Sequence, residues 1–202
     1  GTLAEDNLLE ARENNYLAAL TDIGGQCGLA WLEFSTGGFW VQPVLAKNLS
    51  IAIDRVNPRE LLLSDTLSQK ETLESTLKSI NHKLTRQPLS LFDAQNAQKR
   101  LENLFGVGTL ESFGAFSRAE IAAAGSLIDY VERTQKGKMP RLSRPVQLSS
   151  GSIMEIDGAT RRNLELMRTL SGERKGSLLA TIDHTVTGAG ARLLQSRLAT
   201  PL

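Results

Sequence analysis

Three carboxylates could form a metal-dependent nuclease centre if the fold brings them together. Asp22 lies beside Gly24-Gly25, Glu33 falls within an alternating apolar segment, and Asp65 follows an apolar run. Nucleases that use two metal ions hold them with acidic side chains from neighbouring elements, so these three residues are the candidate ligands. Each also has an ordinary interpretation: Asp22 as a turn residue, Glu33 as a solvated strand residue and Asp65 as a cap before a helix. We favour the ordinary interpretation and expect no catalytic residue.

The chain lacks the usual sequence motifs for binding a metal ion or a nucleotide. The two histidines, His82 and His184, have no second histidine or cysteine at zinc-ligand spacing. A phosphate-binding loop ends in Gly-Lys-Ser/Thr, but Gly137-Lys138 is followed by Met139, and the segment 172–177 (GERKGS) places its lysine before the second glycine. We therefore expect no metal-binding and no cofactor-binding residue.

The composition is that of an ordinary folded chain. Its 202 residues are 41% hydrophobic and 22% charged with a formal net charge of +1, so there is material for a core and no overall attraction to nucleic acid or membranes. The single cysteine, Cys27, excludes an internal disulfide and is typical of a reducing cytoplasm. No segment approaches the roughly 20 apolar residues of a membrane helix, and the polar run 5–15 is unlike a signal peptide. We expect a cytoplasmic protein, cut from a longer chain, that makes no membrane contact.

The first two thirds of the chain predict an α/β fold with a mixed sheet. Alternation and turn signals indicate strands over 16–21, 27–35 and 39–44, and Gly37-Gly38 is a hairpin signal that makes them an antiparallel meander. After residue 44 the apolar residues recur at the three- to four-residue spacing of a helix, and the expected helices then alternate with strands. The further elements expected are a helix through Leu49, Ile53 and Val56 that stops at Asn57-Pro58, a strand over 60–64, a helix over 69–80, an edge strand over 88–92, and helices over 94–105 and 118–135. The last of these is rich in alanine, which indicates close packing on the sheet.

Three helix caps organise the last fifty residues. Asp157, Ser177 and Thr187 each carry a side-chain oxygen that can accept the free amides of a following helical turn. The first of these helices is expected to stop at Gly172. Its apolar face comprises Leu164, Met167 and Leu170.

The composition changes between these two regions. Residues 133–145 carry basic side chains with no acidic partner after Glu132, and Pro140 and Pro145 interrupt regular structure. We therefore place domains at 1–136 and 153–202, joined by a basic linker over 137–152. Basic residues here and in the last region could attract DNA phosphates, although a solvated surface is the ordinary interpretation. Those of the last region are Arg161, Arg162, Arg168, Arg174 and Lys175.

Several strings resemble one family, the MutS mismatch-repair proteins. The last region resembles the start of the family's core, or lever, domain, and the first region resembles its connector domain. The strings that carry the resemblance in the last region are 159–165 (ATRRNLE), 170–172 (LSG), 176–179 (GSLL), 183–187 (DHTVT) and 192–194 (RLL). Those in the first region are 14–19 (NNYLAA), 34–39 (FSTGGF), 57–62 (NPRELL) and 113–114 (FG). One departure is Ala189, which stands where the family usually has methionine.

The resemblance implies both a fold and a role. The fold is a ribonuclease H-like mixed sheet with flanking helices over 1–136, followed by an all-α partial core domain. The role is to couple mismatch binding to the ATPase of a full-length protein and to offer a docking surface to a MutL-type partner. The family's ATP site lies downstream of the matched region and its Phe-x-Glu mismatch wedge lies upstream, so ATP and magnesium would bind elsewhere in the full-length protein. That protein would bind mismatched duplex DNA as a homodimer or larger assembly, and we expect no enzymatic activity in this region.

One polar helix face is the candidate docking surface for the partner. It belongs to the helix expected over 94–105, and an ordinary solvated face is the alternative interpretation. For the whole chain, the alternatives are a ribonuclease H-like metal-dependent nuclease and an unrelated two-part binding module. The candidate docking residues are Gln95, Gln98, Lys99, Arg100 and Glu102.

Overall fold

A six-stranded sheet forms the centre of the molecule. The computed structural model describes residues 12–135, 140–149 and 154–201, and its strands lie in the order β5-β4-β1-β2-β3-β6. β1, β2 and β3 pair antiparallel, whereas β4 is parallel to β1 and β6 is parallel to β3. The prediction of an antiparallel meander within a mixed α/β sheet is therefore confirmed. The strands are β1 (Tyr16–Ile23), β2 (Gln26–Glu33), β3 (Phe39–Val44), β4 (Glu60–Ser64), β5 (Leu84–Gln87) and β6 (Val146–Gln147).

The turn between β1 and β2 depends on two glycines. Ile23 pairs with Gln26, so only Gly24 and Gly25 remain for the loop. Their φ angles are +63° and +84°, in the left-handed region that a two-residue hairpin loop requires when it matches the twist of its strands. The tight turn sets the register of β1 against β2.

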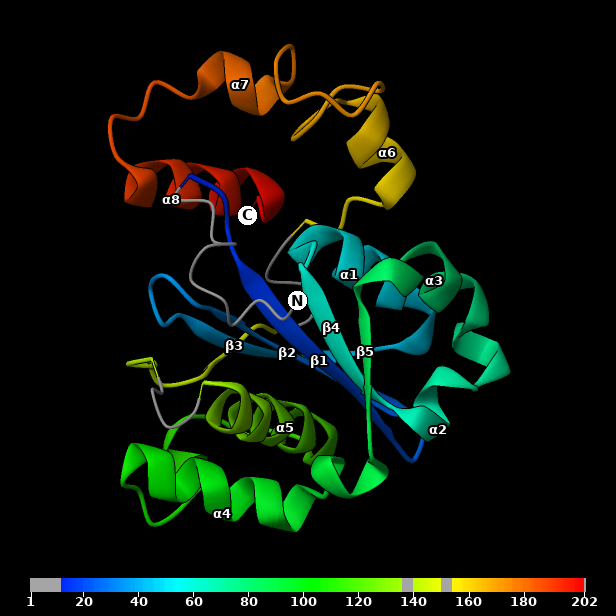
Figure 1. The fold of residues 1–202 in the computed structure, drawn as a ribbon, viewed down its shortest axis with the longest axis vertical. Coiled ribbons are helices and arrows are strands. Elements are labelled where there is room, and N and C mark those ends of the chain that lie inside the picture. The colour runs from blue at the N-terminus through cyan, green and yellow to red at the C-terminus, as the bar shows by residue number, and fades with distance from the viewer. Residues whose placement is uncertain (1–11, 136–139, 150–153, 202) are drawn as a thin grey trace.

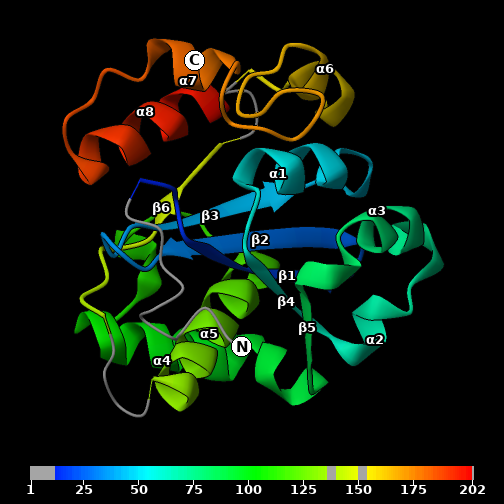
Figure 2. The ribbon, with the colours of Figure 1, turned by 45° about the horizontal axis from the view of Figure 1, so that its top comes forward.

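Helices cover both faces of the sheet (Figure 1, Figure 2). The helices α1 (Leu49–Val56), α2 (Asp65–Ser68) and α3 (Glu74–Ser79) lie on one face, and α4 (Ala94–Phe105) and α5 (Arg118–Thr134) lie on the other. The core under α1 contains Leu29 and Trp31 of β2, and the core under α5 contains Ala30 and Leu32, so β2 alternates as predicted. Among the described residues, no helix is both long and apolar enough to cross a membrane.

Helix α5 packs closely on the sheet, as its alanine content predicts. It begins with a capping box, in which Ser117 and Glu120 each accept the other's backbone amide. The Thr21 hydroxyl of β1 donates to the Ala119 carbonyl at 2.7 Å. Gly28 of β2 lies directly below, where a Cβ atom would stand 2.3 Å from the Ala119 carbonyl carbon. The absence of a side chain at Gly28 therefore sets the distance between this helix and the sheet.

Two elements between β4 and α4 differ from their predictions. The edge strand is β5 (Leu84–Gln87), and residues 89–92 form a 3-10 turn, because Pro88 has no amide to donate to the ladder. The helix predicted over 69–80 is interrupted: a 3-10 turn over 71–73 precedes α3. Lys70 is extended at this break, with φ −74° and ψ 115°, and its ammonium pairs with Asp22. That ion pair joins the start of the segment to the β1–β2 turn.

The C-terminal region contains three helices, α6 (Gly158–Asn163), α7 (Leu178–Ile182) and α8 (Gly188–Ala199). Asp157, Ser177 and Thr187 cap them as predicted, each accepting the amide three residues later. The first helix is shorter than predicted and does not stop at Gly172. The chain leaves the helix after Asn163, and Glu165 adopts φ +47°. Leu166 is buried, whereas Leu164 and Leu170 of the predicted apolar face are exposed. The helix does not continue because its next carbonyls, those of Glu165 and Leu166, accept hydrogen bonds from the amides of Leu178 and Leu179.

The segment predicted as a basic linker pairs with the sheet over part of its length. Within 137–152, Val146 pairs with Trp40 and Gln147 pairs with Val41 to form β6. The Ser143 amide also donates to the Gly37 carbonyl at 2.7 Å. The chain therefore runs along the edge of the sheet before it enters α6, which lies beside α1 (Figure 2).

Candidate functional site

The sheet register separates the three carboxylates that could have formed a nuclease centre. Asp22 faces Cys27 at the turn end of the β1–β2 hairpin, and Glu33 faces Tyr16 at the opposite end. Cys27 and Glu33 are six positions apart on the strand, which corresponds to about 20 Å. Asp65 follows β4, which is parallel to β1, and so it lies toward the Asp22 end. Glu33 cannot share a metal ion with the other two.

Each of these carboxylates has a structural role. Asp22 accepts the Gly25 amide at 2.9 Å and pairs with Lys70, which confirms it as a turn residue. Glu33 is only 2% exposed and is not the solvated residue predicted, because its carboxylate accepts the amides of Asn15 at 3.2 Å and Thr36 at 2.7 Å.

The remaining titratable groups add no metal centre. Asp65 is the first residue of α2 rather than its cap, since Ser64 accepts the Leu67 amide. The Cys27 thiol is buried and free, and burial raises its pKa. Within the described ranges, no group of three His, Cys, Asp or Glu side chains is placed to hold a metal ion. The nuclease alternative is therefore not supported.

The candidate docking face on α4 is exposed at its centre. Asp93 caps the helix by accepting the Asn96 amide at 2.8 Å. Gln95, Gln98 and Lys99 are exposed, and Gln98 donates to the Glu102 carboxylate at 2.8 Å. The structure thus places four of the five candidate residues on one accessible face.

Arg100 differs from the other candidates because it holds α4 against α5. Its guanidinium pairs with Asp129 at 2.8 Å and donates to the Gly125 carbonyl at 3.4 Å. Asp129 also pairs with Arg133 at 2.7 Å. Gly125 lies against Ala97, where a Cβ atom would stand 2.2 Å from the Ala97 Cβ. The candidate docking face is therefore carried on a helix whose inner side is held against α5.

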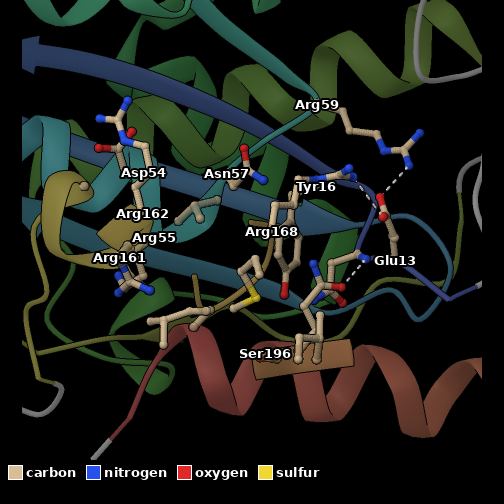
Figure 3. A pocket seen from close by; sticks show the side chains of 18 of the residues that line it. Glu13, Tyr16, Asp54, Arg55, Asn57, Arg59, Arg161, Arg162, Arg168 and Ser196 are labelled. Carbon is tan, nitrogen blue, oxygen red and sulfur yellow. Dashed lines mark hydrogen bonds and ion pairs between the residues drawn. The ribbon is translucent and has the colours of Figure 1, made fainter. Parts of the chain in front are cut away.

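A second concave surface, which we call the basic cleft, lies between α1, the strand ends, the α6 region and α8 (Figure 3). It encloses about 1140 Å³. Two carboxylates, Glu13 and Asp54, line it together with many cations. These cations are Arg55, Arg59, Lys83, Arg161, Arg162, Arg168 and Arg174.

Arg55 is the most deeply placed of these cations. It is 6% exposed, donates to the Gln42 side chain, and lies 5.2 Å from the centre of the Trp31 ring. Burial, followed by the nearby Arg161 guanidinium, lowers the pKa of Arg55 to about 10. The sequence indicated Arg161 and three of its basic neighbours, but it did not indicate Arg55 or Lys83. Arg55 lies three residues after the buried Ala52 of α1, so helical spacing places both on the inner face of the helix. This spacing was the one weak sign in the sequence that Arg55 is buried.

The segment before β1 is tied to the C-terminal region by polar contacts. Arg12 donates to the Asp183 carboxylate at 3.2 Å and to the Thr185 carbonyl at 3.1 Å. Glu13 pairs with Arg168 at 3.1 Å and with Arg59 at 3.4 Å. The Arg12–Asp183 and Glu13–Arg168 contacts join residues more than 150 positions apart in the chain.

The Asp183 contact predicts a pH-dependent stability. The Thr185 hydroxyl, then the Thr185 amide and Arg12, lower the pKa of Asp183 from 3.8 to about 2. A lowered folded-state pKa stabilises the fold above the unfolded-state value, and this stabilisation is lost as the pH falls. We expect Asp183→Asn to lower the urea midpoint by a constant amount above about pH 4, and this difference to shrink toward about pH 2. If the difference in urea midpoint between Asp183→Asn and the unmodified protein did not change with pH, the lowered pKa of Asp183 would be wrong.

Comparison with known proteins identifies two matching domain families. The family model described as MutS domain II matches residues 15–143, and the model described as MutS domain III matches residues 159–202. Together these matches cover β1 to β5 with their helices and nearly all of the three C-terminal helices.

Curated relatives match over the full length of the chain. It is 47% identical over 202 residues to the DNA mismatch repair protein MutS of Anaplasma phagocytophilum, covering 100% of this chain and 25% of that protein. It is 50% identical over 205 residues to MutS of Ruegeria pomeroyi, covering 100% of this chain and 23% of that protein. The chain thus spans about a quarter of the length of the curated relatives it matches.

Proposed function

The chain belongs to the MutS family of DNA mismatch repair proteins, and we propose that it couples mismatch binding to the ATPase of the full-length protein. The sheet with its five helices would act as the connector, with a ribonuclease H-like arrangement, and residues 153–202 would begin an all-α core domain. The region would work mechanically and not as an enzyme. ATP with magnesium would bind elsewhere in the full-length protein, which would bind mismatched duplex DNA as a homodimer or larger assembly in the cytoplasm.

The contacts between the two regions support a mechanical role. Arg12, Glu13 and Asn14 precede β1 and contact Asp183, Arg168 and the α8 side chain Gln195. A shift of the C-terminal helices would therefore pull directly on the first strand of the sheet. Several apolar side chains of the C-terminal region are exposed and could pack on the rest of the full-length core. They are Met154, Leu164, Leu170, Leu178, Ile182, Val186 and Leu193.

We further propose that the α4 face docks a MutL-type partner. The observation that carries this proposal is the exposed row Gln95, Gln98 and Lys99 on a helix whose inner side is fixed by the Arg100–Asp129 ion pair. A rigid face limits the conformational entropy lost on binding. Its mixed polar character suits a reversible, non-obligate interface.

Lys99→Glu in the full-length protein is the test of this face. We expect the affinity for the MutL-type partner to fall about tenfold, because a reversed charge at a complementary interface introduces repulsion. Binding would be measured by surface plasmon resonance with mismatched DNA present. Arg100 is left unchanged, since its replacement would disturb α4 itself.

Lys47→Glu is the matched control for that experiment. Lys47 is exposed and follows β3, away from α4, so the same charge change should leave the affinity unaltered. Equal affinities for Lys99→Glu and the unmodified protein would reject the α4 face. The family assignment would stand in that case, because it rests on the sequence matches.

A further inference from the structure

The basic cleft holds more positive charge than its own carboxylates neutralise. Glu13 is shared by Arg59 and Arg168 at one end of the cleft (Figure 3). Asp54 is the other lining carboxylate, and it lies against α6, where a Cβ atom on Gly158 would stand 2.2 Å from its Oδ2. The other end of the cleft therefore has one carboxylate among four cations. Those cations are Arg55, Lys83, Arg161 and Arg162.

Arg161 has donor capacity that the described residues do not use. Its Nε donates to the Ile156 carbonyl at 3.1 Å, which fixes the plane of the guanidinium. Its Nη2 is buried and has no hydrogen-bond partner in the described part of the chain. Leaving a buried charged donor unsatisfied is costly, and a bound acceptor would remove that cost.

The surroundings of Arg161 make an anion the suitable acceptor. Burial lowers the pKa of Arg55, Arg161 and Lys83, and the Arg55 and Arg161 guanidiniums repel each other. Burial also raises the pKa of Asp54, so this carboxylate is itself poorly solvated. A multiply charged anion between these cations would relieve their repulsion, and guanidinium groups bind phosphoryl oxygens through paired hydrogen bonds.

We propose that the basic cleft is a binding site for a small phosphorylated anion with at least two phosphoryl charges. Arg161 and Arg162 of α6 would hold it from one side and Lys83, which follows α3, from the other. Arg55 contributes its positive potential from below, since its guanidinium is engaged with Gln42 and Trp31. A small ligand fits better than duplex DNA, because a rigid duplex is too wide to reach the floor of the cleft, where Arg55 is 6% exposed.

Pyrophosphate binding to the full-length protein tests this proposal. Hydrogen exchange would be followed by mass spectrometry on peptides covering α1 (49–56) and α6 (158–163), with sodium chloride adjusted to keep the ionic strength constant. This readout follows the cleft itself, and the charge-removing variants separate binding there from an effect of a nucleotide site elsewhere. We expect pyrophosphate to slow exchange in both peptides. No change in either peptide would overturn the proposal.

Charge-removing variants locate the ligand. Arg161→Gln and Arg162→Gln should each raise the pyrophosphate concentration for half-protection about tenfold, because each removes a charge-assisted hydrogen bond. Arg118→Gln, at the exposed start of α5 on the other face of the sheet, should leave it unchanged. Arg162 is exposed, so its variant folds even if Arg161→Gln does not. Unchanged half-protection in Arg162→Gln would overturn the proposal, as would stronger protection by duplex DNA at equal phosphate concentration.

Discussion

Gly28→Ala is expected to destabilise the protein by about 3 kcal/mol or more, a large share of the 5–15 kcal/mol that typical domains have. The new Cβ would stand 2.3 Å from the Ala119 carbonyl carbon, 2.4 Å from the Glu120 nitrogen and 2.5 Å from the Ala119 oxygen. All three are backbone atoms, so no side chain can rotate away. The first turn of α5 would have to lift from β2, which would also break the 2.7 Å hydrogen bond from Thr21. Urea unfolding followed by circular dichroism would measure the loss.

Gly108→Ala is the control for that change. Gly108 has open space around its Cα and does not need a left-handed conformation, so the same substitution should change the free energy of unfolding by less than about 0.5 kcal/mol. A loss of similar size at both positions would contradict the steric explanation, because a Cβ at Gly108 would meet no neighbouring atom. A loss confined to Gly28 would confirm the contact between β2 and α5.

Gly125→Ala is expected to destabilise the protein by about 2 kcal/mol, although alanine favours a helix by about 1 kcal/mol over glycine. The two effects oppose each other, and the steric effect is larger. A Cβ at Gly125 would stand 2.2 Å from the Ala97 Cβ and 2.5 Å from the Ala97 Cα. Helix α4 would therefore move outward and strain the Arg100–Asp129 ion pair. We expect weaker docking of the MutL-type partner together with the lower urea midpoint.

The double variant Gly125→Ala with Ala97→Gly separates contact from propensity. Removal of the Ala97 Cβ relieves the closest approach, whereas the Ala97 Cα at 2.5 Å remains. The double variant should therefore be more stable than the sum of the two single changes predicts, without full recovery. Additive effects, or a stabilising Gly125→Ala, would show that α4 and α5 do not meet at this point.

Local rules predicted those parts of the fold whose causes lie close in sequence. The hairpin at Gly37-Gly38 and the caps Asp157, Ser177 and Thr187 each depend on a few consecutive residues, and all four are present. The α4 helix has the predicted bounds for the same reason, since Asp93 caps it and Gly106 ends it in a left-handed conformation.

The misplaced elements depend on distant partners. The edge strand was predicted over 88–92 but lies over 84–87, because residues 84–87 pair with residues 61–64 of β4. The local sequence around Leu89–Phe92 gives no sign of this pairing. The helix after Asp157 ended early because the chain near Leu178 bonds the carbonyls of Glu165 and Leu166. Such bonds close long loops, and a window of neighbouring residues contains no information about them.

The sequence by itself determined the family, the mixed α/β sheet and the polar face of α4. These follow from long strings that resemble the family, from the regular spacing of apolar residues and from the residue types that form turns. All three are properties of residues close together in the sequence. Only the tertiary structure decided that Glu33 is buried, with two backbone amides donating to its carboxylate, and that Arg100 holds α4 against α5 through Asp129. It alone assembled the basic cleft from Arg55, Lys83 and Arg161, because burial and electrostatic potential arise from elements that meet in space after folding.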